Sequence, residues 1–266
     1  MRDRGSDSVI VHLTELAAYL DAYLRIGDTP DYPPALNGVQ LAHVGPVRSV
    51  AAAVDFSSTT IQGTIDADAN LLIVHHGMFW GGLQRIDGRV YERLKLLFAH
   101  DVAVYAAHLP LDAHPVHGNS RLLAGALGLA VSDGFAPFDG TYCGVRGESD
   151  VETRSLRLRL EEFAREHGGS VVASPFGAGR RTKRWAICSG AGADAKTLGA
   201  ASALGVDTLI VGEGPHWTAV DAIEREIVML YAGHYATETL GVCSLAEHLR
   251  ERFGLPWTFV PAPTGL

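Results

Sequence analysis

The stretch NLLIVHHG (residues 70–77) decides how this sequence folds. Residues 71–74 are all apolar, and an apolar run without polar alternation is typical of a parallel strand buried on both faces. The strand leads straight into His75 and His76, and Gly77 follows. Two interpretations are open at this point: a strand end that tolerates two polar residues, or an imidazole pair that holds a metal.

The same kind of strand recurs along the chain, separated by segments with helical periodicity. We predict strands at 49–57, 185–190, 207–214 and 227–234, and a strand that runs into a loop at 102–112. We predict helices at 9–26, 59–69, 89–101, 118–129, 193–205, 216–226 and 244–254. Repeated strand–helix–strand units indicate a right-handed parallel α/β sheet.

The middle of the chain interrupts this alternation. Residues 130–184 contain weaker period-2 stretches, among them LRLRL (156–160) and GGSVVASPFG (168–177), and the basic patch GRRTKRW (179–185) is interpreted as a solvated turn. Two α/β blocks on either side of an irregular middle indicate two related lobes. We assign residues 1–129 with 235–266 to the first lobe and residues 130–234 to the second.

Composition limits the class of protein. With 47% hydrophobic and 20% charged residues, the 266-residue chain can form one large domain or two interlocked ones. The net charge of −8 argues against a general nucleic-acid or anionic-membrane surface. The three cysteines are far apart without a CxxC pair, which argues against a disulfide framework and a cysteine zinc site. Without an apolar signal core or a membrane-length apolar run, we expect a soluble, cytoplasmic protein.

Histidines and carboxylates stand at the ends of four predicted strands. In chain order they are His75 and His76, His108 and Asp112, Glu213 and His216, and His234 and Glu238. Each alone has a structural interpretation, such as a hydrogen-bonded imidazole or a turn carboxylate, and His114 and His117 are interpreted as solvated loop residues. Carboxyl ends of parallel strands meet at one edge of a sheet, where ligands bind. The set therefore predicts a site, because that edge would otherwise bury several polar groups without partners.

Imidazole nitrogens and carboxylate oxygens without thiolates suit Zn, Fe, Mn, Co or Ni. In an extended backbone His75 and His76 point to opposite sides and serve two ions more readily than one, unless a turn at Gly77 re-aims the second ring. Asp112 and Glu238 are the carboxylates that bridge two such ions, which lie about 3.5–4 Å apart in two-metal sites. Around His234 the pattern predicts a strand end, a turn and a helix that starts near Thr237.

Other catalytic patterns are absent from the sequence. There is no GxSxG, no GxxxxGK[ST], and no GxGxxG followed by a suitable acid. The stretch SGAGADA (189–195) is compatible with an anion-binding helix N-terminus and with a tight structural turn.

Six motifs together resemble the NIF-three-like dinuclear metal-centre family, known as GTP cyclohydrolase I type 2 homologues. They are LNGVQ (36–40), VHHGMFWGG (74–82), AAHLPLDAHPVHGNS (106–120), SGAGAD (189–194), VGEGPHW (211–217) and AGHYATETLGV (232–242). The resemblance implies two interlinked α/β lobes with largely parallel mixed sheets, a metal site in the cleft between them, and ring-shaped homohexamers. It places the metal ligands on His75, His76, Asp112, His234 and Glu238.

The resemblance also implies an activity. Its cyclohydrolase name means hydrolytic opening of a purine imidazole ring, which water activated by two divalent ions can attack. We therefore expect a dinuclear-metal-dependent hydrolase for a small, nucleotide-like substrate, with Glu213, His216 and His108 as proton-transfer or metal-surrounding residues. The alternative is a non-enzymatic protein that binds or delivers metal or regulates a partner.

Overall fold

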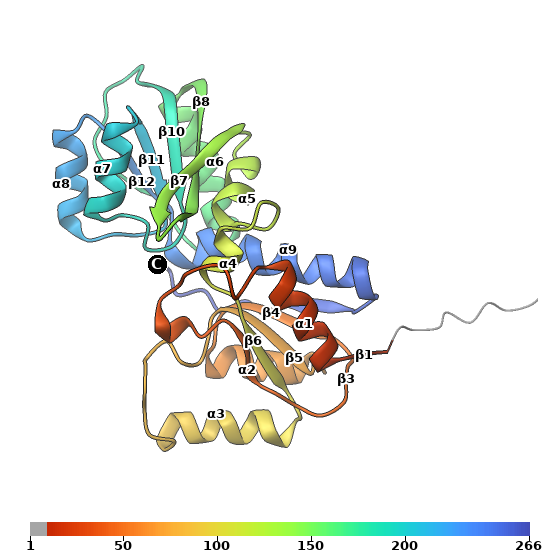
Figure 1. Cartoon of the computed structure of the whole chain (residues 1–266). Coiled ribbons are helices and arrows are strands. Elements are labelled where there is room, and N and C mark those ends of the chain that lie inside the picture. The colour runs from red at the N-terminus through yellow and green to blue at the C-terminus, as the bar shows by residue number, and fades with distance from the viewer. Residues whose placement is uncertain (1–9) are drawn as a thin grey trace, which may run out of the picture. The chain divides into compact units, whose positions relative to one another are not determined.

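The computed structural model describes residues 10–266, and these fold into two compact units (Figure 1). Unit 1 comprises Met1–His108 with Val242–Ala262, and unit 2 comprises Leu109–Gly241 with Pro263–Leu266. The chain therefore passes from one unit to the other three times, as interlinked lobes require. The units differ from the predicted lobes mainly because residues 109–129 pack with unit 2.

Unit 1 is built on a five-stranded sheet with the order β13-β4-β5-β6-β2. The strands are β2 (Gly38–Leu41), β4 (Val50–Asp55), β5 (Leu71–His76), β6 (Ala103–Ala106) and β13 (Trp257–Phe259). β13, β4, β5 and β6 run parallel, and only β2 is antiparallel to its neighbour. Two further strands, β1 (Val11–His12) and β3 (Pro46–Val47), pair with each other. The central strands are buried on both faces, as their unbroken apolar runs predict.

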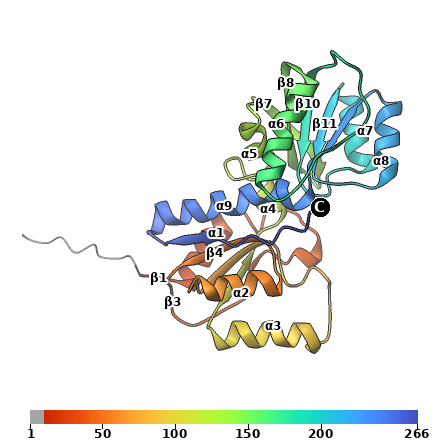
Figure 2. The same ribbon diagram turned by 180° about the vertical axis from the view of Figure 1, so that it is seen from behind.

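Helices cover both faces of this sheet (Figures 1 and 2). They are α1 (Leu13–Tyr23), α2 (Ser58–Asp66), α3 (Gly88–Ala99) and the part of α9 (His234–Phe253) that follows Val242, with a short 3-10 helix at Pro33–Ala35. Ile61 of α2 and Leu97 of α3 pack on one face of the sheet. α1 lies against the other face, where the Tyr105 hydroxyl donates to Asp21 at 2.8 Å.

Unit 2 is built on a six-stranded mixed sheet with the order β7-β8-β10-β11-β12-β9. The strands are β7 (Val131–Phe138), β8 (Thr141–Glu152), β9 (Val172–Ala173), β10 (Arg181–Cys188), β11 (Thr208–Val211) and β12 (Val228–Tyr231). Only β10, β11 and β12 are mutually parallel. The antiparallel strands come from the middle of the chain, where the sequence shows its weak period-2 pattern.

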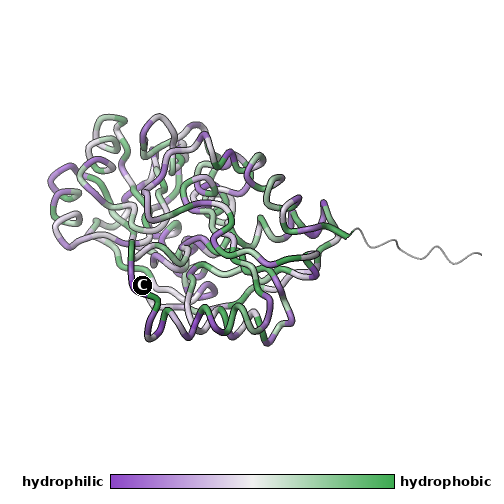
Figure 3. The backbone as a smooth tube through the Cα atoms, turned by 60° about the horizontal axis from the view of Figure 1, so that its bottom comes forward, coloured by the Kyte–Doolittle hydropathy of each residue, from purple (hydrophilic) through white to green (hydrophobic). Residues whose placement is uncertain are grey.

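Five helices and the start of α9 complete unit 2. They are α4 (Leu109–Asp112), α5 (Asn119–Ala126), α6 (Thr153–Glu166), α7 (Ala195–Ala203) and α8 (His216–Glu224). α5 and α6 pack around Trp185 on one face of the sheet, and α7 and α8 pack on the other. Along the helical coils hydrophobic and hydrophilic residues alternate (Figure 3), as expected for helices with one buried face.

Four local predictions are corrected. The stretch LRLRL lies in helix α6, where Leu156 and Leu160 are buried and Leu158 is exposed. The four-residue spacing of the two buried leucines is the helical period, and it outweighs the alternation of period 2. The patch GRRTKRW is mostly the start of strand β10 rather than a turn. The helix predicted at 9–26 begins at Leu13, and residue 9 lies outside the described residues. The helix predicted from Thr237 begins at His234.

Across residues 10–266, every helix is either too short or too polar to span a bilayer.

Candidate metal centre

Unit 1 brings three imidazoles together at the carboxyl ends of two parallel strands. His75 and His76 end β5, and His108 follows β6 by two residues. The ring centroids lie 4.8 Å apart for the adjacent pair and 4.9 Å apart for His75 and His108. One ring nitrogen of each residue lies within 4.8 Å of a ring nitrogen of the other two. The rings of His75 and His76 therefore lie next to each other instead of pointing to opposite sides of the strand. This agrees with the case in which a turn at Gly77 re-aims the His76 ring.

Each of these imidazoles is anchored through its Nδ1 atom. Nδ1 of His75 lies 2.9 Å from the carbonyl oxygen of Ala107, and Nδ1 of His76 lies 2.9 Å from Oδ1 of Asp55. Nδ1 of His108 lies 2.9 Å from Oδ1 of Asp31. Because carbonyl and carboxylate oxygens only accept, Nδ1 carries the proton in all three rings, and Nε2 carries the lone pair. Metal-binding histidines are oriented in this way.

Gly77 allows the chain to pass close to the side chain of Gln40 in β2. A Cβ atom at Gly77 would lie 2.2 Å from Nε2 of Gln40. The Gln40 side chain accepts a hydrogen bond from the backbone N–H of Met78 at 2.7 Å and donates to the carbonyl of Ala35 at 2.9 Å. Gln40 therefore fixes the chain directly after the histidine pair. Trp80 follows, with its ring 4.6 Å from that of His108.

In unit 2, Asp112 is held by a buried amide. Asp112 ends the short helix α4, and its Oδ1 accepts a hydrogen bond from Nδ2 of Asn119 at 2.9 Å. The other end of the Asn119 amide accepts from the backbone N–H of Gly241 in α9 at 2.7 Å. Gly118 makes this turn possible, because a Cβ there would lie 2.3 Å from the carbonyl oxygen of Asp112. Asn119 is the first residue of α5, and its side chain links Asp112 to α9.

The second donor group of unit 2 stands on the first turns of α9. His234 and Glu238 are one turn apart, and Nε2 of His234 lies 3.1 Å from Oε2 of Glu238. An oxygen of Glu238 also lies within 4.8 Å of an oxygen of Asp112. Nδ1 of His234 lies 2.7 Å from Oε1 of Glu213, which follows β11. Glu213, expected as a proton-transfer or metal-surrounding residue, is thus the carboxylate that orients His234.

The two carboxylates change the ionisation of His234 in the metal-free chain. Burial lowers the pKa of this imidazole, but its hydrogen bonds with Glu238 and Glu213 and the charges of both carboxylates outweigh burial. The net effect raises the pKa of His234 to about 9. A concentration of negative charge that holds a proton at this position is also suited to a divalent cation, which competes with that proton.

Glycines at two strand ends make room for these donors. A Cβ at Gly190, after β10, would lie 2.1 Å from Oε1 of Glu238, and the backbone there has φ of +62°. A Cβ at Gly212, after β11, would lie 2.8 Å from Cα of His234. The backbone N–H of Gly190 donates to Oγ1 of Thr237 at 3.0 Å, which ties the strand end to α9.

The remaining predicted residues lie elsewhere. His216 begins α8 and is exposed, and within residues 10–266 its side chain contacts neither Glu213 nor His234 through a hydrogen bond or ion pair. His114 and His117 stack on each other 4.8 Å apart, and His117 is buried, so the expectation that it is solvated is wrong. At the stretch SGAGADA, the Asp194 carboxylate caps α7 itself, which favours the structural-turn interpretation.

A cavity of about 300 Å³ adjoins Asp112 within unit 2. His114 and Arg121 lie on its wall, together with Tyr142. Nδ1 of His114 accepts hydrogen bonds from two backbone N–H groups, so its proton resides on Nε2 and makes that nitrogen a donor. The volume is at the lower end of the range of small-molecule sites.

These donors fit divalent metal ions in chemistry and in orientation. Unit 1 supplies imidazoles with fixed tautomers, and unit 2 supplies one imidazole and two carboxylates, without a thiolate among them. The anchoring residues Asp55, Asp31 and Asn119 were missed from sequence. Asp55 lies inside the predicted strand at 49–57, and in the structure it ends β4, which pairs with the strand that carries His76. The five predicted ligands divide between the two units, and their action as one centre stays a prediction.

Comparisons with known proteins identify the family of this chain. The family model Duf34/NIF3 (NGG1p interacting factor 3) matches residues 11–264. A Deinococcus radiodurans protein named GTP cyclohydrolase 1 type 2 homolog is 40% identical over 95% of this chain and 94% of its own length. A Pyrococcus horikoshii protein of the same name is 39% identical over 95% of this chain and 98% of its own.

Solved structures share the fold. TTHA1606 from Thermus thermophilus aligns with a TM-score of 0.82 and 38% identity, covering 96% of this chain and all of that one. The protein ybgI, described as of unknown function, aligns with a TM-score of 0.86 and 32% identity over the same shares. The similarity extends over nearly the whole length of each protein, and the chain belongs to the Duf34/NIF3 family.

Proposed function

We propose that this protein is a metal-dependent hydrolase for a small, nucleotide-like substrate, and that five residues jointly hold two divalent ions. These residues are His75, His76, Asp112, His234 and Glu238. The observation that carries the proposal is the anchoring of Nδ1 in all three histidines, which makes Nε2 the metal-binding atom of each. The relatives' name, GTP cyclohydrolase 1 type 2 homolog, supports a ring-opening hydrolysis.

Bound divalent ions would supply Lewis acidity and a water of lowered pKa. The chain supplies the rest. Asp112 and Glu238 contribute negative charge that holds the cations, and Asp55 and Glu213 keep His76 and His234 in the required tautomer. Arg121 and Tyr142, on the wall of the cavity beside Asp112, provide a cation and a hydroxyl for polar groups of the substrate. His216 stays the candidate for proton transfer.

The metal part of the proposal is tested with the double variant His76→Ala/Glu238→Ala. We expect elemental analysis to find two equivalents of metal per wild-type chain and none in the variant, with an unchanged circular dichroism spectrum. The matched control is His100→Ala/Glu224→Ala, which removes the same residue types from exposed positions in the two units. Two equivalents of metal in the first variant would contradict the assignment.

The catalytic part is tested separately on the metal-loaded wild type. Incubation with GTP and a panel of phosphoesters and cyclic amides should give turnover that the double variant lacks. Complete inactivity with Zn, Fe, Mn, Co and Ni would contradict the hydrolase and favour metal binding or delivery without catalysis. The homohexamer is proposed from the family resemblance, and light scattering of the purified protein tests it. The cytoplasmic location expected from the sequence stays a proposal.

A further inference from the structure

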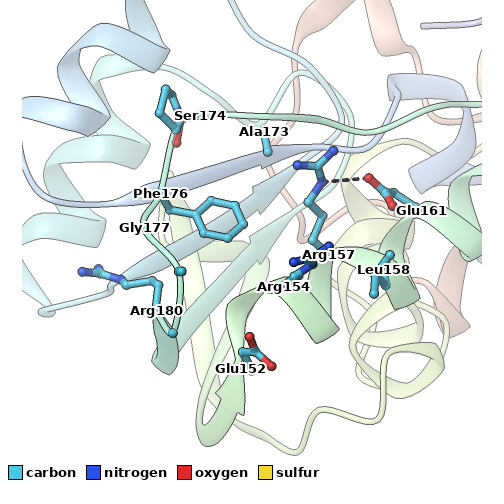
Figure 4. Close-up of a pocket in the computed structure, with 13 residues that line it drawn as sticks. Glu152, Arg154, Arg157, Leu158, Glu161, Ala173, Ser174, Phe176, Gly177 and Arg180 are labelled. Carbon is cyan, nitrogen blue, oxygen red and sulfur yellow. Dashed lines mark hydrogen bonds and ion pairs between the residues drawn. The ribbon is translucent and has the colours of Figure 1, made fainter.

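A second, larger cavity in unit 2 is lined by arginines. It has a volume of about 640 Å³ and lies between the first turns of α6 and the loop at residues 174–180 (Figure 4). This volume is in the middle of the range for small-molecule sites. The loop is tied to the helix by a hydrogen bond from the backbone N–H of Thr153 to the carbonyl of Arg180 at 2.9 Å.

The cavity lies at the opposite edge of the sheet from the metal donors. The guanidinium of Arg180 donates to the carbonyl of Glu226 at 3.0 Å and to that of Asp207 at 3.4 Å. These two residues precede β12 and β11, whereas Glu213 and His234 follow the carboxyl ends of the same strands. Strands of four residues, roughly 13 Å long, separate the two edges. The cavity is therefore a site of its own.

Two arginines of α6, Arg154 and Arg157, are one turn apart and both line the cavity. The lining also holds Arg180 and the carboxylates of Glu152 and Glu161, so the arginines outnumber the acidic residues by one. Within residues 10–266 the side chain of Arg154 makes no hydrogen bond or ion pair, and Arg157 donates through Nε to Glu161 at 2.7 Å. That bond orients the guanidinium of Arg157 while its Nη groups face no other carboxylate partner in residues 10–266. Paired guanidinium groups match the geometry of phosphate oxygens.

An aromatic ring completes the wall opposite the arginines. Phe176 projects from the loop toward the helix face that carries Arg154 and Arg157 (Figure 4). Its ring is partly buried against the core, so one side is held in place. Gly177 and Gly179 follow in the loop, and a Cβ at either position would meet nothing within 4 Å, so the rim there is bare backbone. A flat ring can enter over this rim and stack on Phe176.

We propose that this cavity binds a small phosphomonoester with an aromatic ring, of the mononucleotide class, independently of the metal centre. The phosphate lies between Arg154 and Arg157, and the ring lies against Phe176. A nucleoside without phosphate lacks the guanidinium contacts, and inorganic phosphate lacks the stacking contact. Both therefore bind more weakly than the complete ligand.

The test is isothermal titration of the full chain with GMP, guanosine and inorganic phosphate. We expect GMP to bind at least about tenfold more tightly than guanosine, which lacks the charged hydrogen bonds, and roughly threefold to tenfold more tightly than inorganic phosphate, which lacks the stacked ring. The variant Arg154→Gln/Arg157→Gln should lose at least about tenfold in GMP affinity. Phe176→Leu keeps the apolar packing without the ring and should lose roughly threefold to tenfold.

Two controls separate this site from the metal centre. Arg165→Gln/Arg89→Gln removes two exposed arginines outside the cavity and should bind GMP like the wild type. In His76→Ala/Glu238→Ala, whose metal centre is disabled, GMP should still bind the cavity, and adding Arg154→Gln/Arg157→Gln to that variant should remove the binding. GMP binding that survives in the combined variant, or that is absent from His76→Ala/Glu238→Ala alone, would overturn the proposal. Equal affinity for GMP and guanosine would do the same.

Discussion

The two units present their candidate metal donors in different ways. Unit 1 offers nitrogen atoms of imidazoles whose rings are fixed by acceptors behind them, such as Asp55 behind His76. Unit 2 offers mostly carboxylate oxygens, and these are placed by close backbone approaches at Gly118 and Gly190 and by the amide of Asn119. Directional hydrogen bonds therefore position the donors of unit 1, whereas charge and available space determine the donor positions in unit 2.

The largest expected effect comes from removing a donor in either unit. Glu238→Gln keeps the shape of the side chain but removes its charge, and we expect metal affinity to fall by more than about 100-fold, beyond the loss for an outer partner. Because carboxylates suit Mn²⁺ and imidazoles suit Zn²⁺, Glu238→Gln should weaken Mn²⁺ binding more, and His75→Gln should weaken Zn²⁺ binding more. Competition titrations against a chelating dye measure the affinities for both ions.

The control for this pair is Glu224→Gln, which removes an exposed carboxylate from the end of α8. It should leave both affinities unchanged. If Glu238→Gln and His75→Gln each weakened Mn²⁺ and Zn²⁺ binding to the same extent, the distinction between a nitrogen-rich and an oxygen-rich unit would have no effect on metal preference.

A smaller effect is expected from the glycines beside the donors. Gly190→Ala puts a methyl group 2.1 Å from Oε1 of Glu238 at a backbone φ of +62°, so it should displace the carboxylate and weaken metal binding. It should also lower the free energy of unfolding by about 1–3 kcal/mol through backbone strain. Gly77→Ala meets the amide of Gln40 instead, so it should lower stability and leave metal affinity within about threefold of wild type.

Urea unfolding and metal titration on both glycine variants give the two quantities. If Gly77→Ala lost its metal and Gly190→Ala kept it, the expected order of the two metal affinities would be reversed. Available space, rather than hydrogen bonding, would then limit metal binding in unit 1.

Replacing the carboxylates that hold the imidazoles should have a moderate effect on metal affinity. Asp55→Asn and Glu213→Gln keep a polar side chain next to His76 and His234 but remove the charge that holds Nδ1–H, and we expect metal affinity to fall about 10–100-fold. The loss should be greater for Asp55→Asn if orientation matters more in unit 1. Thermal unfolding of the metal-free variants should change little, because both carboxylates are more than a third exposed.

Sequence patterns predicted the parallel strands and the donors at their ends, because a buried parallel strand has an unbroken apolar run that leads into its polar residues. His75, His76 and His108 were found in this way. The anchoring residues were not, because hydrogen-bond partners depend on strand register: Asp55 lies opposite His76 only through the pairing of β4 with β5. Asp31 lies 77 positions from His108, in a loop whose path no periodicity reveals.

The middle of the chain was harder to predict for a physical reason. The alternation of leucine and arginine at 156–160 is compatible with both a strand and a helix, and tertiary packing decides between them. Leu156 and Leu160 reach the core from successive turns of α6, and Leu158 is 57% exposed. The start of α9 was misplaced for a related reason, because His234 lies directly after a Gly-containing strand end and does not signal a helix start by itself.

The smallest effect on metal binding is expected at Asp31, and it decides what His108 does in unit 1. The Asp31 side chain is 6% exposed and accepts hydrogen bonds from Nδ1 of His108 and from Nδ2 of Asn37. Asp31→Asn should lower the free energy of unfolding by about 1–3 kcal/mol, because a buried acceptor loses its charge and part of its bonding. If His108 is a structural imidazole, metal affinity should change less than about threefold, since the other rings have their own anchors. A loss as large as that of Asp55→Asn would instead make His108 a third nitrogen ligand, and the contrast between the nitrogen-rich and the oxygen-rich unit would become greater.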